Sequence, residues 1–436
     1  MNLIAKSCFS PGLITLVSNL ITSSADYSED SENLWFEEYI EGMGHEIYRI
    51  KLSEKLEKRY FRDIVRIVYK KTKTIAFAIQ IRTNHGKTVI RLNPCDFLVN
   101  NIQENDIHVY AICPDKAVAE SIETIEMTKE EKSRYFVLKE KKSQEDKLLL
   151  DGEPEDDMFS SSSDEDAQPV PLFPTLADEA DEDEEEEVLS GEVRKEDMYY
   201  MEKGGYAHKG DRMTKINLEE DPNIRNHIIV VGMHSSIEDF IMPLRSRQMK
   251  EEQLQKIVLV TSQPGSPELG KQHSYLLNQI RKYKEIYRII GSPLNQETFL
   301  RANINFADKV VILGQDPTMK QNLDDEMLDA ESIYIYKAIK KCNKEVQIIT
   351  ELVYSSNIDF LMPSLQSNNC SYKLTTLYAA GEVYISSIID TLTCQAYFNA
   401  HIVTILQQLL RGNTEDDDED VAKFTRAHPD LLQSNL

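Results

Sequence analysis

The chain has 436 residues, a formal net charge of −25 and six cysteines. This length allows roughly two to four domains, and the acidic balance argues against general binding to nucleic-acid phosphates. The acidity is uneven, because residues 151–192 hold 18 acidic side chains and no lysine or arginine. The cysteines form neither a CxxC pair nor a Cys/His cluster, which argues against a zinc site and indicates a reducing compartment. No stretch approaches the ~18 apolar residues of a membrane-spanning helix.

The first predicted element is an amphipathic helix within residues 11–21. Pro11 suits a helix start, and apolar side chains then recur at the spacing i, i+3, i+4 and i+7. A lone helix of this length is marginal in water, so we expect it to pack on a later part of the chain or on another chain. The apolar stripe consists of Leu13, Leu16, Val17 and Leu20.

Residues 45–114 predict a small α/β subdomain, preceded by a helical interface segment at residues 1–44. An apolar helix face is expected at residues 61–68, and Asn84-His85-Gly86 predicts a hairpin turn. The alternating or apolar runs that predict strands are residues 45–52, 75–81, 87–92 and 106–112.

Residues 115–225 predict a charged and largely disordered linker, and residues 413–436 predict an acidic tail. The acidic run in the linker lacks the apolar side chains that would offset the entropy of ordering. Ser161, Ser162 and Ser163 each have an acid three residues on. Acid-directed phosphorylation of the serine run at 160–163 is one interpretation, and a solvated spacer is the other.

Residues 226–353 predict a Rossmann-like domain with a doubly wound parallel sheet. Short apolar runs suit strands that are buried on both faces of such a sheet, and they alternate here with more polar helices. Ser235 and Ser236 are expected to cap the helix after the first run. The runs are residues 227–231, 257–260, 287–290, 310–313 and 346–352.

The turn after the first of these strands is where a dinucleotide-binding domain carries Gly-x-Gly-x-x-Gly. Only Gly232 is present here, and His234 stands where the close-approach glycine is needed. The second strand ends in Thr261 rather than in an acid. We therefore predict no bound cofactor. No G-x-S-x-G, H-E-x-x-H or Walker lysine appears, so no catalytic residue is predicted and the chain is interpreted as not being an enzyme.

One acidic cluster offers oxygen ligands for a metal ion. Asp324, Asp325 and Glu326 lie at a helix start after the fourth strand. Hard cations bind clustered carboxylate oxygens, whereas acids in a first helical turn commonly complement the helix dipole. Both interpretations stay open at this point.

Residues 354–412 predict a helical assembly element with two apolar-faced helices. One stripe is formed by Ile385, Ile388, Ile389 and Leu392, and the other includes Ile402 and Leu406. Together with the stripe near the N-terminus, these side chains make a predicted assembly interface.

Several motifs resemble the Slo family of potassium channels, which includes calcium-activated channels of large conductance and their sodium-activated relatives. HIIVVG, IMPLR, GSPLNQETFLRANINFADKVVIL and LYAAGEVYISSIIDTLTCQAYFN are similar to the second regulator-of-K⁺-conductance (RCK) domain of that family. PGLITLVSNLI, GHEIYRI and RLNP are similar to the back half of the first RCK domain. The resemblance covers residues 10–113 and 226–412.

The resemblance implies a cytosolic gating ring in which four subunits pair eight such domains beneath the pore. Cation binding would shift the ring toward the shape that opens the pore. The implied partners are further copies in a homo-oligomer, a tetramer, or pore-containing subunits, with the membrane reached only through the pore. The implied ligand is a regulatory Na⁺ or Ca²⁺.

Three departures from the family bear on that expectation. Pore helices, a selectivity filter and the Rossmann half of the first domain do not appear, so we interpret the chain as a fragment, a truncated product or a subunit that needs a pore from elsewhere. Residues 364–373 hold no carboxylate where calcium-activated members carry an aspartate run, and Asp359 is the nearest acid. Gln80 stands where an acid would be wanted as a calcium ligand. These substitutions weaken the expectation of calcium control.

The main prediction is a cytosolic regulatory region of a ligand-gated potassium channel. One alternative is a soluble Rossmann-fold regulator that senses a nucleotide and controls a separate K⁺ transporter. It requires the turn at Gly232 to hold a ligand. A second alternative is a Rossmann-type oxidoreductase, which requires an acid–base pair for which the turn offers only His234.

Overall fold

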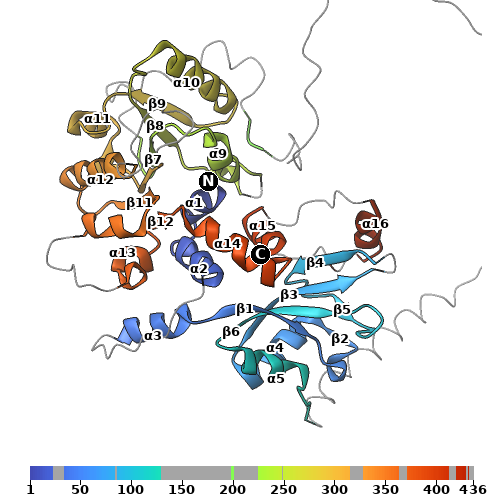
Figure 1. Cartoon of the computed structure of the whole chain (residues 1–436). Helices are drawn as coiled ribbons and strands as arrows, with labels where there is room; N and C mark the ends of the chain where they lie inside the picture. Colours follow the sequence, from blue (N-terminus) through green and yellow to red (C-terminus); the bar gives the residue numbers. More distant parts are fainter. Residues whose placement is uncertain are drawn as a thin grey trace, which may run out of the picture. The chain divides into compact units, whose positions relative to one another are not determined.

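The protein forms a six-stranded parallel sheet with helices on both faces and a separate four-stranded antiparallel sheet (Figure 1). The predicted Rossmann-like doubly wound sheet and the preceding small α/β subdomain are thereby confirmed. The computed structural model describes residues 1–22, 34–83, 86–128, 198–200, 224–247, 249–314, 328–362, 371–411, 419–428 and 431.

The parallel sheet has the strand order β12-β11-β10-β7-β8-β9. The chain moves outward from β7 to β9 and then returns to add β10 on the other side of β7, which makes the pair β7–β10 the topological switch point. Five strands match predicted runs to within a residue. The strands are β7 (Ile228–Val231), β8 (Ile257–Thr261), β9 (Ile286–Ile290), β10 (Lys309–Ile312), β11 (Gln347–Leu352) and β12 (Val383–Ile385).

The sixth strand corrects the sequence reading. Ile385 belongs to β12, which pairs in parallel with β11, and not to the helical stripe in which we placed it. Three strand residues are too few to show a period of two, and the apolar spacing from Ile385 to Leu392 also fits a helix.

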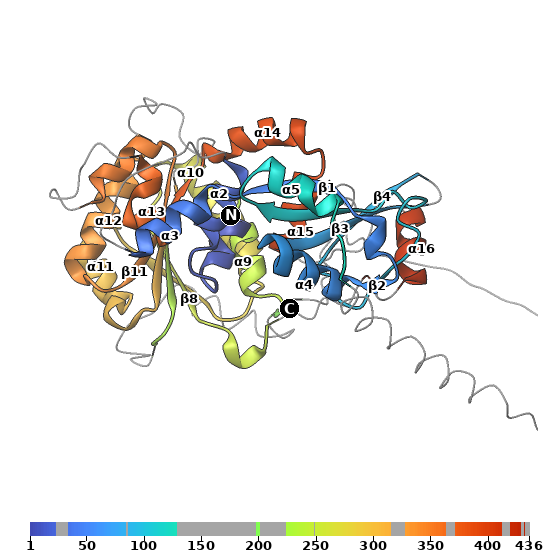
Figure 2. The same cartoon turned by 90° about the horizontal axis from the view of Figure 1, so that it is seen from below.

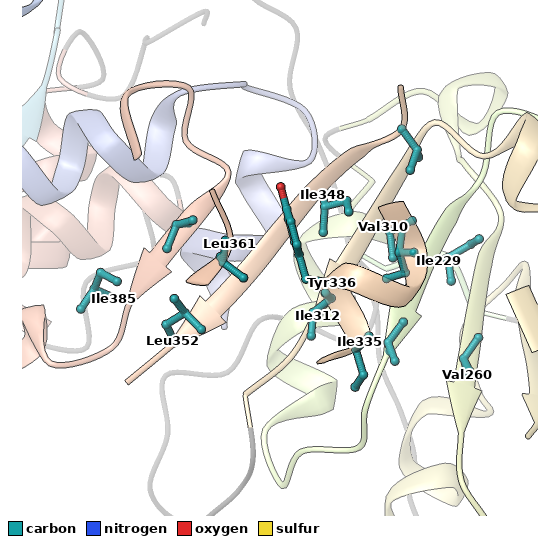
Figure 3. Packing of buried hydrophobic residues seen from close by; sticks show 14 of the residues in the cluster. Ile229, Val260, Val310, Ile312, Ile335, Tyr336, Ile348, Leu352, Leu361 and Ile385 are labelled. Atoms are coloured by element: carbon teal, nitrogen blue, oxygen red, sulfur yellow. The ribbon is translucent and has the colours of Figure 1, made fainter. Parts of the chain in front are cut away.

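Helices cover both faces of the parallel sheet because each right-handed crossover places its helix on one side. Ile228 and Val230 of β7 face α9 and α10, whereas Ile229 and Val231 face the opposite layer. In that layer Ile335 and Tyr336 pack over the sheet (Figure 3). The helices are α9 (Ile237–Leu244) and α10 (Pro267–Ile280) on one face, and α11 (Gln296–Arg301) and α12 (Ala330–Cys342) on the other.

Two N-terminal helices complete the face that α9 and α10 cover only in part. They are α1 (Asn2–Ser7), which was not predicted, and α2 (Leu13–Ile21). Ile4 and Ile14 lie in the same buried cluster as Val311 of β10 and Ile349 of β11. The amphipathic helix near the N-terminus therefore packs on a later part of its own chain.

The antiparallel sheet has the order β1-β6-β3-β4, with α4 and α5 packed beside it (Figure 2). Helix α5 corrects the linker boundary at residue 115. Asp115 caps this helix by accepting the Val118 N–H at 2.8 Å, and Ile122 is buried. The elements are α3 (Leu34–Met43), β1 (Glu46–Lys51), β2 (Arg59–Tyr60), α4 (Phe61–Thr72), β3 (Ile75–Arg82), β4 (Thr88–Leu92), β5 (Leu98–Val99), β6 (His108–Cys113) and α5 (Lys116–Glu123).

The C-terminal part continues the helical layer. Helix α16 lies within the predicted acidic tail and corrects it, because Thr425 is buried and its hydroxyl accepts a hydrogen bond of 2.9 Å from Arg91. The elements are the 3-10 helices η6 (Ser355–Phe360) and η7 (Tyr372–Leu374), and the helices α13 (Thr376–Ala379), α14 (Ile388–Phe398), α15 (Ile402–Arg411) and α16 (Glu419–Ala427).

Among the helices of the described part of the chain, none has the combined length and apolar character needed to cross a bilayer. The predicted disordered linker lies mostly outside the described residues, and so do the serine run at 160–163 and the turn residues Asn84 and His85.

Candidate interdomain interface and strand-end turn

The turn after β7 is shaped by one glycine and one histidine. Gly232 has a φ of 105°, and a Cβ there would lie 3.3 Å from the Leu313 carbonyl oxygen. The backbone N–H of Ser236 donates to Nδ1 of His234 at 3.0 Å. The imidazole therefore holds the backbone of Ser236, the N-cap residue of α9, whose hydroxyl makes no cap hydrogen bond, contrary to the expected serine cap. The prediction that no cofactor binds here stays a prediction.

The second feature is a set of polar contacts between α2 and the segment that leads into β12. The Thr15 hydroxyl donates to the Tyr378 carbonyl, and the Tyr378 hydroxyl donates to Asn19 Oδ1 at 3.2 Å. Burial raises the pKa of Tyr378, so its phenol stays protonated and able to donate. All three residues are buried. These contacts fix the rotation of α2 against the sheet edge, because a buried donor without an acceptor is unfavourable.

Lys373 extends this contact with a buried positive charge. Its ammonium donates to the Thr22 hydroxyl at 2.8 Å, and its carbonyl accepts from the Tyr39 hydroxyl at 2.9 Å. The residue is 6% exposed, and burial lowers the pKa of the ammonium. The family's calcium-activated members are expected to carry carboxylates just before this position, whereas here a cation is buried.

Two glycine turns meet backbone to backbone beside these contacts. Gly12 begins α2 with a φ of 81°, and Gly381 precedes β12 with a φ of 75°. A Cβ at Gly381 would lie 2.8 Å from the Cα of Gly12. No side chain fits between the two turns.

Helix α15 has one side in each of two cores. Ile402 and Leu406 belong to the cluster of the parallel sheet. Ile405 is fully buried against Ile90 and other side chains of the antiparallel sheet. The Gln408 side chain also donates to the Ile90 carbonyl at 2.9 Å. We call α1, α2, α14 and α15 the helical junction, because these helices lie between the two sheets in the contact network.

Gln80 is buried in the antiparallel sheet, where it joins the buried Tyr110 and the exposed Arg49 in one polar cluster. Its Oε1 accepts hydrogen bonds from Arg49 Nε at 2.8 Å and from the Tyr110 hydroxyl at 2.9 Å. Burial raises the pKa of Tyr110 to about 12. Arg49 also lies 3.2 Å from His108 Nδ1. With two protein donors on its oxygen and a guanidinium beside it, Gln80 does not fit the oxygen cage that Ca²⁺ requires.

The junction also brings a histidine toward this cluster. His401 immediately precedes α15, and burial and then the charge of Arg49 lower the pKa of its imidazole. Protonation of His401 would place two positive charges near one another across the junction, which is unfavourable in a partly buried setting.

Most of the side chains predicted as an assembly interface are covered within one chain. Val17, Ile385, Ile388, Ile402 and Leu406 are buried. Leu13 and Leu392 are partly buried against the same cluster, and Leu20 is half-buried. Leu16 is the exception at 55% exposed. The side chain of Ile389 lies outside the described residues. Contact with another copy stays a prediction for this surface.

The metal candidates Asp324, Asp325 and Glu326 lie outside the described residues. Elsewhere in the described ranges, no group of three or more His, Cys, Asp or Glu side chains is arranged to hold a metal ion. Sequence reasoning missed Tyr378 and Lys373, although LYAAG was noted as a motif. A buried lysine gives no signal in a loop of polar residues, because its partner Thr22 at the end of α2 lies 351 residues away in the sequence.

Two family models match the chain, one over most of the parallel-sheet domain and one over the N-terminal helices and the first part of the antiparallel sheet. The model described as "Calcium-activated potassium channel slowpoke-like RCK domain" matches residues 223–350. The model described as "Calcium-activated BK potassium channel alpha subunit" matches residues 1–79.

The relatives extend this result. Potassium channel subfamily T member 1 of Gallus gallus is 26% identical over 227 residues, which cover 47% of this chain and 18% of that protein. The solved structure of the human SLO3 gating ring matches with a TM-score of 0.61 and 18% identity over 94% of this chain and 60% of that one. This chain therefore spans less than a fifth of the curated relative. At 18% identity the SLO3 likeness shows the fold alone. The family models confirm the resemblance to the Slo family seen in the sequence motifs, and the chain is similar to an RCK-type domain over residues 223–350.

Proposed function

We propose that this chain is the cytosolic gating-ring region of a potassium channel, where it couples the binding of an intracellular cation to the opening of a pore. The observation that carries the proposal is the two-sided burial of α15. Ile402 and Leu406 pack with the parallel sheet, and Ile405 packs with the antiparallel sheet. The names of the family models and of the channel relative support the same assignment.

The mechanism is a population shift between arrangements of the two sheets. A cation that binds one arrangement more tightly than the other shifts the equilibrium by its difference in affinity. Movement of either sheet must move α15 or open its packing, and opening a close-packed contact is unfavourable. A displacement at one sheet is in this way carried to the other.

The ring requires further copies of the chain, and we propose a tetramer. Leu16 supports a contact between copies, because it projects an exposed leucine from a helix that is otherwise packed. Light scattering on the purified chain should show a tetramer, and Leu16→Glu should weaken association. Val403→Glu is the matched control, since Val403 is also an exposed apolar residue of the junction. A particle that stays monomeric at high concentration contradicts this part of the proposal.

The regulatory cation is proposed to be Na⁺ or Ca²⁺. Gln80 does not fit Ca²⁺, so the acids at 324–326 are the better candidates in this chain. Thermal unfolding should shift upward on titration with the effective cation, because a ligand that binds only the native state stabilises it. The triple variant Asp324→Asn, Asp325→Asn, Glu326→Gln should abolish that shift. A shift that survives the triple variant places the cation elsewhere.

The channel assignment is tested by a chimera. The region of the chicken subfamily T channel that this chain matches is replaced by the corresponding part of this chain, and K⁺ current is recorded against intracellular Na⁺ and Ca²⁺. We expect current whose cation dependence shifts with Ile405→Ala and not with Leu409→Ala, an exposed residue of the same helix. If both variants traffic normally and gate alike, α15 does not couple the two sheets to the pore.

Neither alternative function gains support from the turn after β7. A nucleotide-sensing regulator or an oxidoreductase needs close backbone approach of a ligand at this turn. The His234 imidazole instead receives the Ser236 N–H that such a ligand would use.

A further inference from the structure

A short segment inside the predicted linker is docked on the parallel-sheet domain. Met198, Tyr199 and Tyr200 lie between two stretches of sequence that are outside the described residues. Met198 is 4% exposed and belongs to the same buried cluster as Leu244 at the end of α9 and Tyr283 just after α10. We call residues 198–200 the anchor.

The backbone of the anchor is held from both sides. Isolated antiparallel bridges join Met198 to Ser246 and Tyr200 to Tyr283. The Tyr199 N–H donates to the Arg245 carbonyl at 2.8 Å, and the Tyr199 carbonyl accepts from the Lys284 N–H at 3.1 Å. This is strand addition on a small scale, in which main-chain hydrogen bonds position a peptide and side-chain pockets select its sequence.

Each side chain of the anchor has its own contact. The Tyr199 hydroxyl donates to the Met249 carbonyl at 2.8 Å. The Tyr200 ring stacks on Tyr283 with centroids 5.3 Å apart. The Lys282 ammonium lies 6.0 Å from the Tyr200 ring and pairs with Glu238 at 2.7 Å. The site thus selects an apolar side chain, then a phenol that donates, then an aromatic ring flanked by a cation.

The surface that receives the anchor is fixed by groups outside the anchor. Arg245 is 1% exposed, and its guanidinium donates to the carbonyls of Gln255, Lys284 and Glu285. These bonds tie the end of α9 to the turn before β9. Arg245 therefore supplies the carbonyl that accepts the Tyr199 N–H, and its guanidinium also holds the Lys284 carbonyl. Because these guanidinium bonds do not involve the anchor, the site is formed in advance of docking.

We propose that the surface between Ser246 and Lys284 is a docking site for a peptide of the pattern apolar-Tyr-Tyr, occupied in the native chain by its own anchor. The contact involves three residues, so it can open without unfolding the sheet beneath it. The anchor divides the linker into a span before residue 198 and a span after residue 200, and release joins them into one. This inference does not depend on the channel assignment.

The test uses the full chain with Met198→Asp and Tyr200→Ala, which disables the anchor and leaves the receiving surface unchanged. A fluorescent peptide of residues 194–203 is titrated against this chain and against the native chain. We expect saturable binding to the disabled chain and at least ~10-fold weaker binding to the native chain, because a tethered competitor acts at a millimolar effective concentration. The variant Tyr206→Ala, in the same stretch of sequence, should bind the peptide as weakly as the native chain.

Two further variants separate docking from folding. Tyr283→Ala in the disabled chain should abolish peptide binding, and a peptide with Tyr199→Phe should bind roughly 2- to 10-fold more weakly, since it lacks one hydrogen-bond donor. A phosphotyrosine at position 199 should weaken the peptide further, because it replaces the donor with negative charge beside a carbonyl oxygen.

Hydrogen exchange at the Tyr199 amide gives an independent readout. We expect the Tyr199 amide to be protected in the native chain and in Tyr206→Ala, and to lose that protection in the disabled chain. The melting temperature of the disabled chain verifies that it is folded. Exchange at the free-peptide rate in the native chain overturns the proposal. Equal peptide binding by native and disabled chains, or no binding by a folded disabled chain, also overturns it.

Discussion

The two sheets of this protein are stabilised in different ways. The parallel sheet has apolar strands at its centre, such as Ile228–Val231 of β7, and helices on both faces. The antiparallel sheet buries the hydrogen-bonded pair of Gln80 and Tyr110 among its apolar residues, and the exposed Arg49 donates to the same Gln80 oxygen. The first sheet depends on close packing, whereas the second also depends on every buried polar group having a partner.

Because of this difference, we expect the two sheets to respond differently to substitution of their buried residues. An apolar core tolerates exchange of one hydrophobic residue for another of similar volume. A buried polar pair does not, because removal of one member takes a hydrogen bond from the buried group that remains. The helical junction contacts both sheets. Substitutions in it should therefore show both the tolerance of the apolar core and the sensitivity of the polar groups.

The largest effect is expected in the parallel-sheet domain. Phe299 of α11 is fully buried, and Phe299→Ala should lower the free energy of unfolding by about 3–5 kcal/mol through lost burial and a cavity. Its neighbour Leu300 is 51% exposed and provides the control. Urea denaturation should leave Leu300→Ala within ~0.5 kcal/mol of the native chain. Equal losses for both variants contradict the packing described here.

The next effect tests whether the two sheets are coupled. Ile405→Ala should cost about 2–4 kcal/mol, because the truncation leaves a cavity at the antiparallel sheet. Unfolding followed by separate probes for the two sheets should then show less coincident transitions than in the native chain. Leu409→Ala, on the exposed side of α15, should keep the transitions as they are. Coincident transitions in Ile405→Ala would show that α15 is dispensable for coupling.

A smaller effect is expected for the polar cluster. Gln80→Leu should cost about 1–3 kcal/mol, because it leaves donors of Arg49 and Tyr110 without their acceptor. Tyr110→Phe added to Gln80→Leu should cost less than the sum of the single changes. Additive costs in this double-mutant cycle would mean that the two side chains do not interact.

The smallest effect concerns the titration of Lys373. Burial lowers the pKa of its ammonium below 10.5, so the unfolded chain holds this proton more tightly than the folded chain does. The stability linked to this group is complete above pH 10.5 and is lost as the pH falls toward the lowered folded pKa. The native chain should therefore gain stability relative to Lys373→Met as the pH rises toward 10.5, by at most ~1.4 kcal/mol per pH unit.

The control for this titration is Lys341→Met on the exposed surface of α12. Urea denaturation over the same pH range is measured for this variant, for Lys373→Met and for the native chain. A flat difference for Lys373→Met would mean that the ammonium is hydrated.

The sequence predicted the parts of the fold whose signal is local. Five strands of the parallel sheet have four residues or more, most of them apolar or aromatic, and each was placed to within a residue. β12 was missed because it has three residues, and α1 because it has fewer than two turns and no cap. These elements are stabilised by their neighbours in space.

The candidate site was less accessible from the sequence than the fold. The sequence showed that Gln80 replaces an expected acid, but it did not show the residues around it. The two donors to Gln80 come from β1 and β6, which only the register of the sheet brings together. The anchor at residues 198–200 lies in a charged stretch with no periodicity. Arg245 was part of a motif, yet nothing in IMPLR indicates that its guanidinium is enclosed by carbonyl oxygens.

The contact of Gly12 with Gly381 sets a geometric limit on the protein. The two turns leave no room for a side chain between their main chains, so α2 has little space to advance toward the sheet edge. Withdrawal from that edge is the less restricted movement. A single added methyl group at Gly381 would act as a spacer and hold the two turns apart, which makes this position a place where the protein could be locked in a withdrawn state by one substitution.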